Sequence, residues 1–211
     1  VHALIQAGAD LNQARDDGTT PLFMVCEEGH LEVVHALIQA GADLNQARDD
    51  GATPLFIACG KGHVEVVHAL IQAGAALNQA MHDGATPLYV ACQEGHVEVV
   101  HALIQAGAAL NQATDVGGYT PLYTACYHGH VEMVHALIQA GAVLNQADHN
   151  SATPLYVACQ EGHLEVVHAL IQAGADLNQA SAVCDTHLLG QFTVVHLVLG
   201  LGLVQGGGDV L

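Results

Sequence analysis

The order of apolar and polar residues indicates a chain built from short amphipathic helices. Val66, Val67, Leu70 and Ile71 form one apolar stripe at helical spacing, with polar residues between them. Gly74 follows this stripe and suits the left-handed residue that ends many helices. We therefore predict a short helix here that buries one face and exposes the other.

A second helix is predicted directly before this one. Thr53 is a good N-cap, and Pro54 suits the first helical position because its missing N–H would have no partner inside the helix. This helix has to stop at Gly62, and Asp50-Gly51 before it provides the small residues of a tight turn with positive φ. Neither helix can cover its own apolar face, so such units have to stack on one another.

The unit returns with a nearly constant period. Thr-Pro-Leu begins at Thr20, Thr53, Thr86, Thr120 and Thr153, which lie 33, 33, 34 and 33 residues apart. Each copy is followed by Gly-His-x-Glu, by Val-His-Ala-Leu-Ile-Gln-Ala-Gly-Ala and by Leu-Asn-Gln-Ala. Repeats 1 to 5 are residues 15–47, 48–80, 81–113, 114–147 and 148–180, and residues 1–14 are a partial repeat identical to residues 34–47. A period of this length indicates a solenoid.

These repeated phrases closely resemble the ankyrin repeat family over residues 1–180. The resemblance implies an all-α solenoid, in which helix-turn-helix pairs stack side by side and β-turns or hairpins project as tips. It also implies a concave groove, lined by the tips and the first helices, that binds another protein.

The chain departs from the family pattern at three kinds of position. The family usually has histidine after Thr-Pro-Leu, whereas this chain has Phe23, Phe56, Tyr89, Tyr123 and Tyr156. We interpret these rings as packing residues, in preference to ligand-binding residues. Repeat 4 has one extra residue before Tyr119, which we expect the turn tip to absorb. Ser151 replaces the turn glycine of repeat 5, which costs stability if φ stays positive there.

Residues 181–211 are predicted to be a degenerate repeat or cap with an apolar, glycine-rich tail. Thr186 to Leu189 is similar to the Thr-Pro-Leu start of the complete repeats. The segment that is similar to the second helix follows it after fewer residues than in the complete repeats. A cap is expected to have a polar outer face, whereas Val198 to Val204 is mostly apolar. Either the tail caps imperfectly or another surface covers it, and self-association through it stays open.

The charge of the chain narrows the choice of partner. It has 21 acidic residues against 3 lysines and arginines, a formal charge of −18. A field of this sign repels phosphate and anionic lipid, so we expect neither nucleic acid nor a membrane surface as partner.

The longest apolar stretch, Phe192 to Val204, is shorter than the ~20 residues of a membrane helix. The chain has no initiator Met and begins inside a repeat, so we expect a piece of a longer protein.

Cysteines form a ladder through the first helices at Cys26, Cys59, Cys92, Cys126 and Cys159, and Cys184 stands alone in the tail. Helices of neighbouring repeats should pack ~8–10 Å apart, whereas a disulfide needs Cα atoms within ~7 Å. We expect buried, free thiols that act as small hydrophobes. Unpaired cysteines indicate a reducing compartment, and hence an intracellular location in the cytoplasm or nucleus.

Histidines form two periodic sets. The set in the Gly-His link between helices is expected to bond to the backbone, and consists of His30, His63, His96, His130 and His163. The set on the second helices is expected to form an exposed row, and consists of His2, His35, His68, His101, His135 and His168. His30 and His35 would lie about 140° apart on a helix, which differs from the zinc-protease spacing. We predict no metal site.

Motifs for catalysis and cofactors are absent from the sequence. It contains no phosphate loop, Gly-x-Gly-x-x-Gly or Gly-x-Ser-x-Gly, and the only serines are Ser151 and Ser181. An exposed thiol beside a base is not expected either. We therefore predict no catalytic residue and no cofactor, and expect that the chain is not an enzyme.

The repeats differ from one another mainly at the turn tips and at the ends of the first helices. In the ankyrin family these positions line the binding groove, so the resemblance makes them candidate protein-binding residues. On the tips they are Asp16, Asp17, Asp49, Asp50, His82, Asp83, Asp115, Tyr119, His149 and Asn150. At the helix ends they are Glu27, Glu28, Lys61, Gln93, Glu94, Tyr127, His128, Gln160 and Glu161. Taken singly, each is better explained as a solvated surface position, but as a set they form the candidate site. Tyr119, Tyr127 and His128 place amphipathic groups at repeat 4, as an interface anchor requires.

Three hypotheses for the function remain open at this point. The first is a module that binds a basic or mixed-charge protein partner in the groove. The second is a regulatory or recognition region of an enzyme or channel whose active part lies outside this sequence. The third is a consensus-designed array, which the near-identical second helices favour and the ladder of buried cysteines disfavours. A longer sequence would separate the first two.

Overall fold

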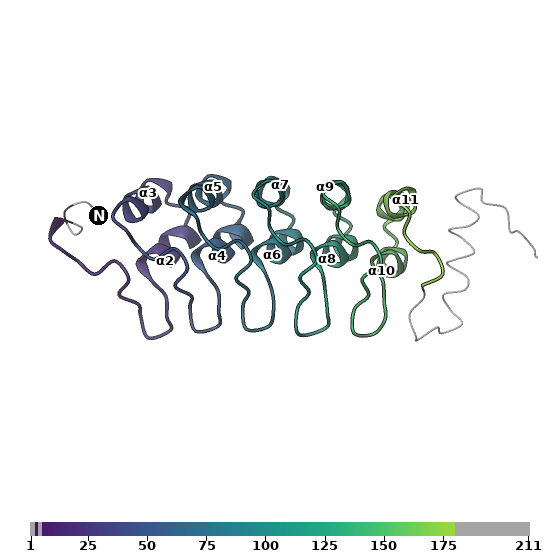
Figure 1. Cartoon of the computed structure of the whole chain (residues 1–211), viewed down its shortest axis with the longest axis horizontal. Helices are drawn as coiled ribbons and strands as arrows, with labels where there is room; N and C mark the ends of the chain where they lie inside the picture. Colours follow the sequence, from purple (N-terminus) through teal and green to yellow (C-terminus); the bar gives the residue numbers. More distant parts are fainter. Residues whose placement is uncertain (1–2, 4–5, 180–211) are drawn as a thin grey trace, which may run out of the picture.

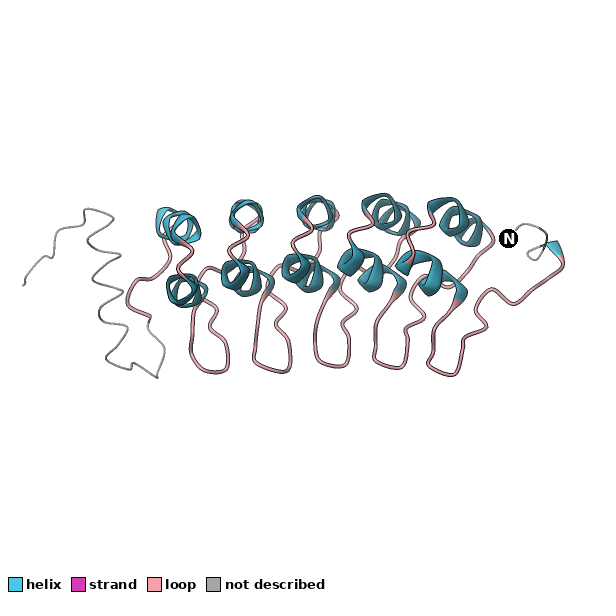
Figure 2. Ribbon diagram, turned by 180° about the vertical axis from the view of Figure 1, so that it is seen from behind, coloured by secondary structure: helices cyan, strands magenta, loops and turns pink. Residues whose placement is uncertain are grey.

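The structure is a computed structural model that describes residue 3 and residues 6–179, and this part of the chain contains ten α-helices and no strand (Figure 1). The first helices of repeats 1 to 5 are α2 (Pro21–Glu27), α4 (Pro54–Lys61), α6 (Pro87–Glu94), α8 (Pro121–His128) and α10 (Pro154–Glu161). The second helices are α3 (Leu31–Gln39), α5 (Val64–Ala73), α7 (Val97–Gln105), α9 (Val131–Gln139) and α11 (Leu164–Gln172). Figure 2 shows the two layers edge-on, with the turn tips projecting beyond the layer of first helices. The predicted all-α solenoid is confirmed.

Local signals define the ends of the helices. The Thr53 hydroxyl accepts a hydrogen bond from the Phe56 N–H at 3.1 Å, and Pro54 occupies the first turn of α4. α4 ends at Gly62 with φ 73°, and α5 ends at Gly74 with φ 91°. The threonines that begin the other first helices make the same bond. The predicted helix starts and stops are confirmed.

The core runs between the two layers and continues from one repeat to the next. Leu55, Cys59, Val67 and Leu70 are at most 1 % exposed, and their counterparts in the other repeats belong to the same apolar cluster. Burying one leucine side chain stabilises a fold by roughly 1.5–3 kcal/mol. Each repeat therefore gains stability from the apolar contacts it shares with its neighbours.

Polar groups join neighbouring repeats at three levels. At the tips, the His82 N–H donates to the Asp50 carbonyl at 3.0 Å. Between the helices, His63 Nε2 lies 3.0 Å from the Glu27 carbonyl oxygen, which confirms that this histidine bonds to the backbone. After the second helix, Asn78 Oδ1 accepts from a backbone N–H of the next repeat at 2.8 Å. These bonds hold the repeats in one register.

The cysteine ladder is buried at four of its five positions. Cys26, Cys59, Cys92 and Cys126 are buried free thiols, whereas the free thiol of Cys159 is only half-buried. The expectation of burial is therefore wrong for Cys159. It lies in α10, the last first helix that the structure describes, so the ladder has no described first helix on its other side.

The row of second-helix histidines is also less regular than predicted. Exposed as predicted are His35, His68, His101 and His135. His168 is half-buried instead, and its Nε2 is buried without a hydrogen-bond partner. His2, Cys184 and the cap expected at residues 181–211 lie outside the described residues.

No helix within residues 6–179 has the length and apolar character that crossing a bilayer requires.

Candidate protein-binding cleft

The acidic residues on the tips divide into two groups. Asp17, Asp50 and Asp83 each accept a hydrogen bond at 3.0 Å from the backbone N–H two residues further on. Their carboxylates hold the turns, so their first role is structural. Exposed on the tips are Asp16, Asp17, Asp49, His82, Asp83, Asp115, His149 and Asn150, whereas Asp50 and Tyr119 are half-buried.

Asp50 is also less available to a partner because its carboxylate forms an ion pair with Arg48. The hydrogen bond from the Arg48 side chain is the main reason why the pKa of Asp50 lies below its usual value. The Arg48 guanidinium also lies over the Phe23 ring, with its central carbon 5.1 Å from the ring centroid. The tip between repeats 1 and 2 is thus closed by the chain's own residues.

Most predicted residues at the ends of the first helices face solvent. Exposed are Glu28, Lys61, Gln93, Glu94, Tyr127, His128, Gln160 and Glu161. Glu27 is half-buried, and its carbonyl accepts the bond from His63. These residues follow one another along the layer of first helices, so they form a row and not a closed site.

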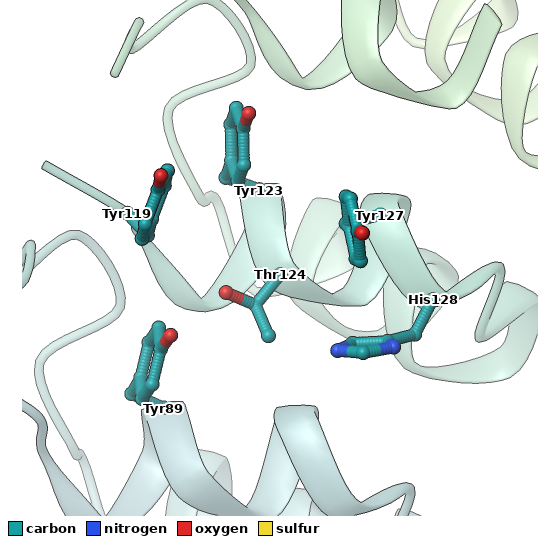
Figure 3. Close-up of a pocket in the computed structure, with 6 residues that line it drawn as sticks. All are labelled: Tyr89, Tyr119, Tyr123, Thr124, Tyr127 and His128. Atoms are coloured by element: carbon teal, nitrogen blue, oxygen red, sulfur yellow. The ribbon is translucent and has the colours of Figure 1, made fainter. Parts of the chain in front are cut away.

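At repeats 3 and 4 the surface is hollowed into an open cleft of about 250 Å³. Its lining residues are Tyr89, Tyr119, Tyr123, Thr124, Tyr127 and His128. Tyr89 comes from α6, Tyr119 from the tip before α8, and the other four from α8 itself. Figure 3 shows Tyr119 and Tyr123 on one side, Tyr127 and His128 on another, and Tyr89 facing them with Thr124 in between. We call this hollow the tyrosine cleft.

The rings of the tyrosine cleft hold one another in place. Tyr119 stacks on Tyr123 with centroids 5.0 Å apart and planes 28° apart. Tyr127 meets His128 edge to face at 5.0 Å, and His128 stacks on His130 at 5.7 Å. Tyr127 is nevertheless 45 % exposed. The cleft therefore presents ordered aromatic surface to solvent.

The extra residue of repeat 4 explains why the cleft forms here. It is absorbed at the tip, as predicted, where Gly117 and Gly118 have φ of 92° and 73°. Thr114 closes the longer turn because its Oγ1 accepts from the Tyr119 N–H at 3.1 Å. The other tips carry alanine or threonine at the position of Tyr119, so only this tip places a ring against the first helix.

The residue that begins the next repeat decides how far each first-helix aromatic is covered. Arg48 covers Phe23, which is 1 % exposed, and Met81 packs in the small cluster with Phe56. Thr114 holds this place beside Tyr89, which stays half-buried, and the two line a second hollow of about 350 Å³ next to the tyrosine cleft. The surface opens where the covering residue becomes small.

At Tyr123 the same place is held by Asp148. The Tyr123 hydroxyl donates to Asp148 Oδ2 at 3.2 Å, while Asp148 Oδ1 accepts from the Ala152 N–H at 2.8 Å. Burial first, and then the nearby charge of Asp148, raise the pKa of Tyr123 well above its usual value. The phenol therefore stays protonated beside a buried carboxylate.

Burial also shifts the pKa of Tyr89 in the cleft and of His130 beside it. It raises the pKa of Tyr89, while a hydrogen bond with Thr124 acts in the opposite direction. It lowers the pKa of His130, with the nearby His128 as the next cause. The described residues contain no group of three His, Cys, Asp or Glu side chains that could hold a metal ion. The cleft is an aromatic surface rimmed by weakly polar groups.

Sequence reasoning identified part of this cleft. It placed Tyr119, Tyr127 and His128 together at repeat 4, and the structure brings these three into one lining. It treated Tyr89 and Tyr123 as packing residues and did not single out Thr124. The signal that could have found Tyr89 and Tyr123 is the change from phenylalanine to tyrosine between repeats 2 and 3.

Comparison with protein families gives one consistent result. A model of three ankyrin repeats matches residues 1–81, 32–114, 73–148 and 107–181. Comparison with curated proteins gives no match. Ankyrin repeats are generally protein–protein interaction modules, and their fold is typically non-catalytic. Since the matches together extend over residues 1–181, and the helix pairs stack as such repeats do, the chain belongs to the ankyrin repeat family.

Proposed function

We propose that the chain recognises a protein partner along its tips and first helices, with the tyrosine cleft at the centre of the contact. The observation that carries this proposal is the gathering of four tyrosines and a histidine around one open hollow. Tyrosine is among the residues that supply most of the binding energy at protein interfaces. Its ring gives a large contact area and its hydroxyl gives a hydrogen bond, while binding has to order only two side-chain torsions.

The stacked repeats support this role because they present the cleft in a fixed geometry. The tip of repeat 4 is bonded to repeat 3 through the Asp115 N–H and the Asp83 carbonyl, at 2.7 Å. A partner would therefore bind without ordering the tip first, which saves conformational entropy. The acidic groups on the tips and helix ends, such as Asp16, Asp49 and Glu94, favour a basic or mixed-charge partner.

Selection of binders from a peptide library against the whole chain tests this proposal. Tyr127→Ala is expected to weaken binding of the selected peptides by about 2 kcal/mol, roughly thirtyfold in affinity, mainly through faster dissociation. The matched control is His68→Gln on the opposite layer, where the ring is exposed and affinity should stay within about threefold. Loss of binding in the control, with Tyr127→Ala unaffected, would place the interface on the second helices instead.

A further inference from the structure

We propose that the tyrosine cleft receives the guanidinium group of an arginine side chain carried by the protein partner. The proposal rests on the proposed function, since the same cleft is the centre of the contact. It adds the chemistry of the group that enters the cleft.

The first argument is the composition of the lining. Four of the six lining residues are tyrosines, and none is a lysine or arginine. Tyrosine faces carry the negative part of the ring quadrupole and attract cations held within about 6 Å of the centroid. The phenol oxygens add acceptors for N–H groups. A cleft with this lining favours a cationic, multiply donating group over an anion.

The second argument is that the chain already builds this contact once. At the first interface between full repeats, the Arg48 guanidinium lies over Phe23 at 5.1 Å and pairs with Asp50. Phe23 and Tyr123 occupy the same position in repeats 1 and 4, directly after Thr-Pro-Leu. The first helix and tip of a repeat can therefore hold a guanidinium over an aromatic ring.

The third argument is the residue that takes the place of Arg48 beside Tyr123. The first residue of repeat 5 is Asp148, so an anion stands where repeat 2 has its own cation. Asp148 is 8 % exposed and accepts a hydrogen bond from Tyr123. The array thus supplies ring and cation at repeats 1 and 2, and ring and carboxylate at repeats 4 and 5. The Asp148 carboxylate therefore adds negative charge next to one of the rings that line the cleft.

The fourth argument is the charge around the cleft. Asp83 lines the adjoining hollow, and Asp115 is exposed on the tip beside it. The whole chain has only 3 lysines and arginines to compete with an incoming cation. The local field therefore adds to the attraction of the rings.

Arginine fits this lining better than lysine. A guanidinium is planar and stacks on aromatic faces, is more weakly hydrated than an ammonium, and offers five N–H donors in a fixed fork. The cleft offers the partly or fully exposed rings of Tyr89, Tyr119 and Tyr127, and further oxygens at Tyr123 and Thr124. Because the aromatic lining cannot replace the full hydration shell of an ammonium, lysine should bind more weakly.

The test uses N-acetyl-arginine amide as the probe and the ring signals of the tyrosines in NMR spectra as the readout. The chain has five tyrosines and no tryptophan, and four of the tyrosines line the cleft. Tyr156 on α10 is the internal control. We expect saturable shifts at the four cleft tyrosines, with a dissociation constant on the order of 1 mM, and no shift at Tyr156.

Matched compounds separate charge from shape. N-acetyl-citrulline amide has nearly the same shape without the charge, and we expect it to bind at least tenfold more weakly. N-acetyl-lysine amide is expected to bind at least threefold more weakly than the arginine compound. Equal or tighter binding of either compound would overturn the assignment of a guanidinium.

Two variants of the chain separate the ring from the carboxylate. Tyr119→Ala gives the tip of repeat 4 the residue that repeats 2, 3 and 5 have there. This change should weaken binding of the arginine compound at least fivefold. Asp148→Asn keeps an oxygen for the Ala152 N–H and removes the charge. This change should weaken binding of the arginine compound about threefold. Tyr156→Phe is the control without effect. Unchanged binding in both Tyr119→Ala and Asp148→Asn would contradict the proposal.

The outcome of the arginine-binding test is independent of the outcome of the peptide selection. If selected peptides bind and depend on Tyr127 while the arginine compound does not bind, the protein-binding role stands and the arginine assignment fails. If the arginine compound binds while peptide binding ignores Tyr127, the cleft is a cation site and the proposed interface fails.

Discussion

At the scale of the single residue, Ser151 holds a conformation that glycine adopts more easily. Its φ is 66°, and no other non-glycine residue of the described chain has a positive φ. The left-handed region costs an ordinary residue roughly 1–2 kcal/mol, while glycine adds roughly 0.5–1 kcal/mol of unfolded-state entropy. We expect Ser151→Gly to raise the free energy of unfolding by about 0.5–1 kcal/mol, measured by urea denaturation.

The reverse change at the same tip position of repeat 3 is the control. Gly84 has φ 84°, and a Cβ there would lie 2.5 Å from the Asp115 backbone nitrogen. Gly84→Ser should therefore destabilise by more than Ser151→Gly stabilises. Equal stability of both variants and the parent chain would show that neither tip is strained.

The buried thiols give a second prediction at this scale. Burial raises the pKa of Cys26 to about 12, and it raises the pKa of Cys92 as well, whereas an unfolded thiol ionises near 8.5. A raised folded pKa means that the contribution to stability is complete below pH 8.5 and is lost as pH rises toward the folded value. We expect the free energy of unfolding to fall between pH 8 and pH 10 in reducing buffer.

Cys92→Ala isolates one thiol from the other groups that titrate in this range. A thiol that ionises only in the unfolded chain contributes about 2 kcal/mol to the fall between pH 8 and pH 10. The fall should be smaller by about this amount in Cys92→Ala than in the parent chain. An identical fall in the two proteins would mean that Cys92 ionises equally well in the folded state.

At the scale of the helix pair, the link histidine joins one repeat to the next. His63 Nε2 lies 3.0 Å from the Glu27 carbonyl, across the interface between repeats 1 and 2. Removing one partner of such a bond leaves a carbonyl unsatisfied and costs roughly 1–3 kcal/mol. We expect His63→Ala to lower the free energy of unfolding by about 1–2 kcal/mol.

His68 provides a control of the same residue type on the following helix. It is exposed on α5, so His68→Ala should change the free energy of unfolding by no more than about 0.5 kcal/mol. Urea denaturation of both variants checks the pair. If the two variants are equally stable, the link histidines do not hold the repeats together.

At the scale of the whole molecule, the acidic surface should act on the rate of encounter with a partner. Asp16, Asp49 and Asp115 are exposed on three tips and hold no turn through their side chains in the described structure, unlike Asp83. Replacing all three with asparagine is expected to slow association with a basic peptide several-fold and to flatten its dependence on salt. Stopped-flow or surface binding kinetics measures both rates.

Dissociation is the internal comparison for this charge prediction. Charges at the rim of an interface steer the encounter more than they hold the complex, so the dissociation rate should stay within about threefold. A change confined to dissociation would mean that the three carboxylates contact the partner directly.

Local chemistry made much of this fold readable from the sequence. The hydroxyl of Thr53 bonds three residues ahead, and Gly62 and Gly74 end the helices that precede them. Because these interactions span only a few residues, the period, the helix bounds and the stacked architecture follow from the order of residues alone.

The tertiary structure alone decided which residues meet across repeats. Tyr89 and Tyr123 are 34 positions apart in the sequence, and only the stacking distance and the longer tip of repeat 4 place them around one cleft with Tyr119. The pairing of Asp148 with Tyr123 and the half-buried state of Cys159 arise in the same way. A repeated sequence determines the unit and its period, whereas the surface depends on which small differences the stack brings side by side.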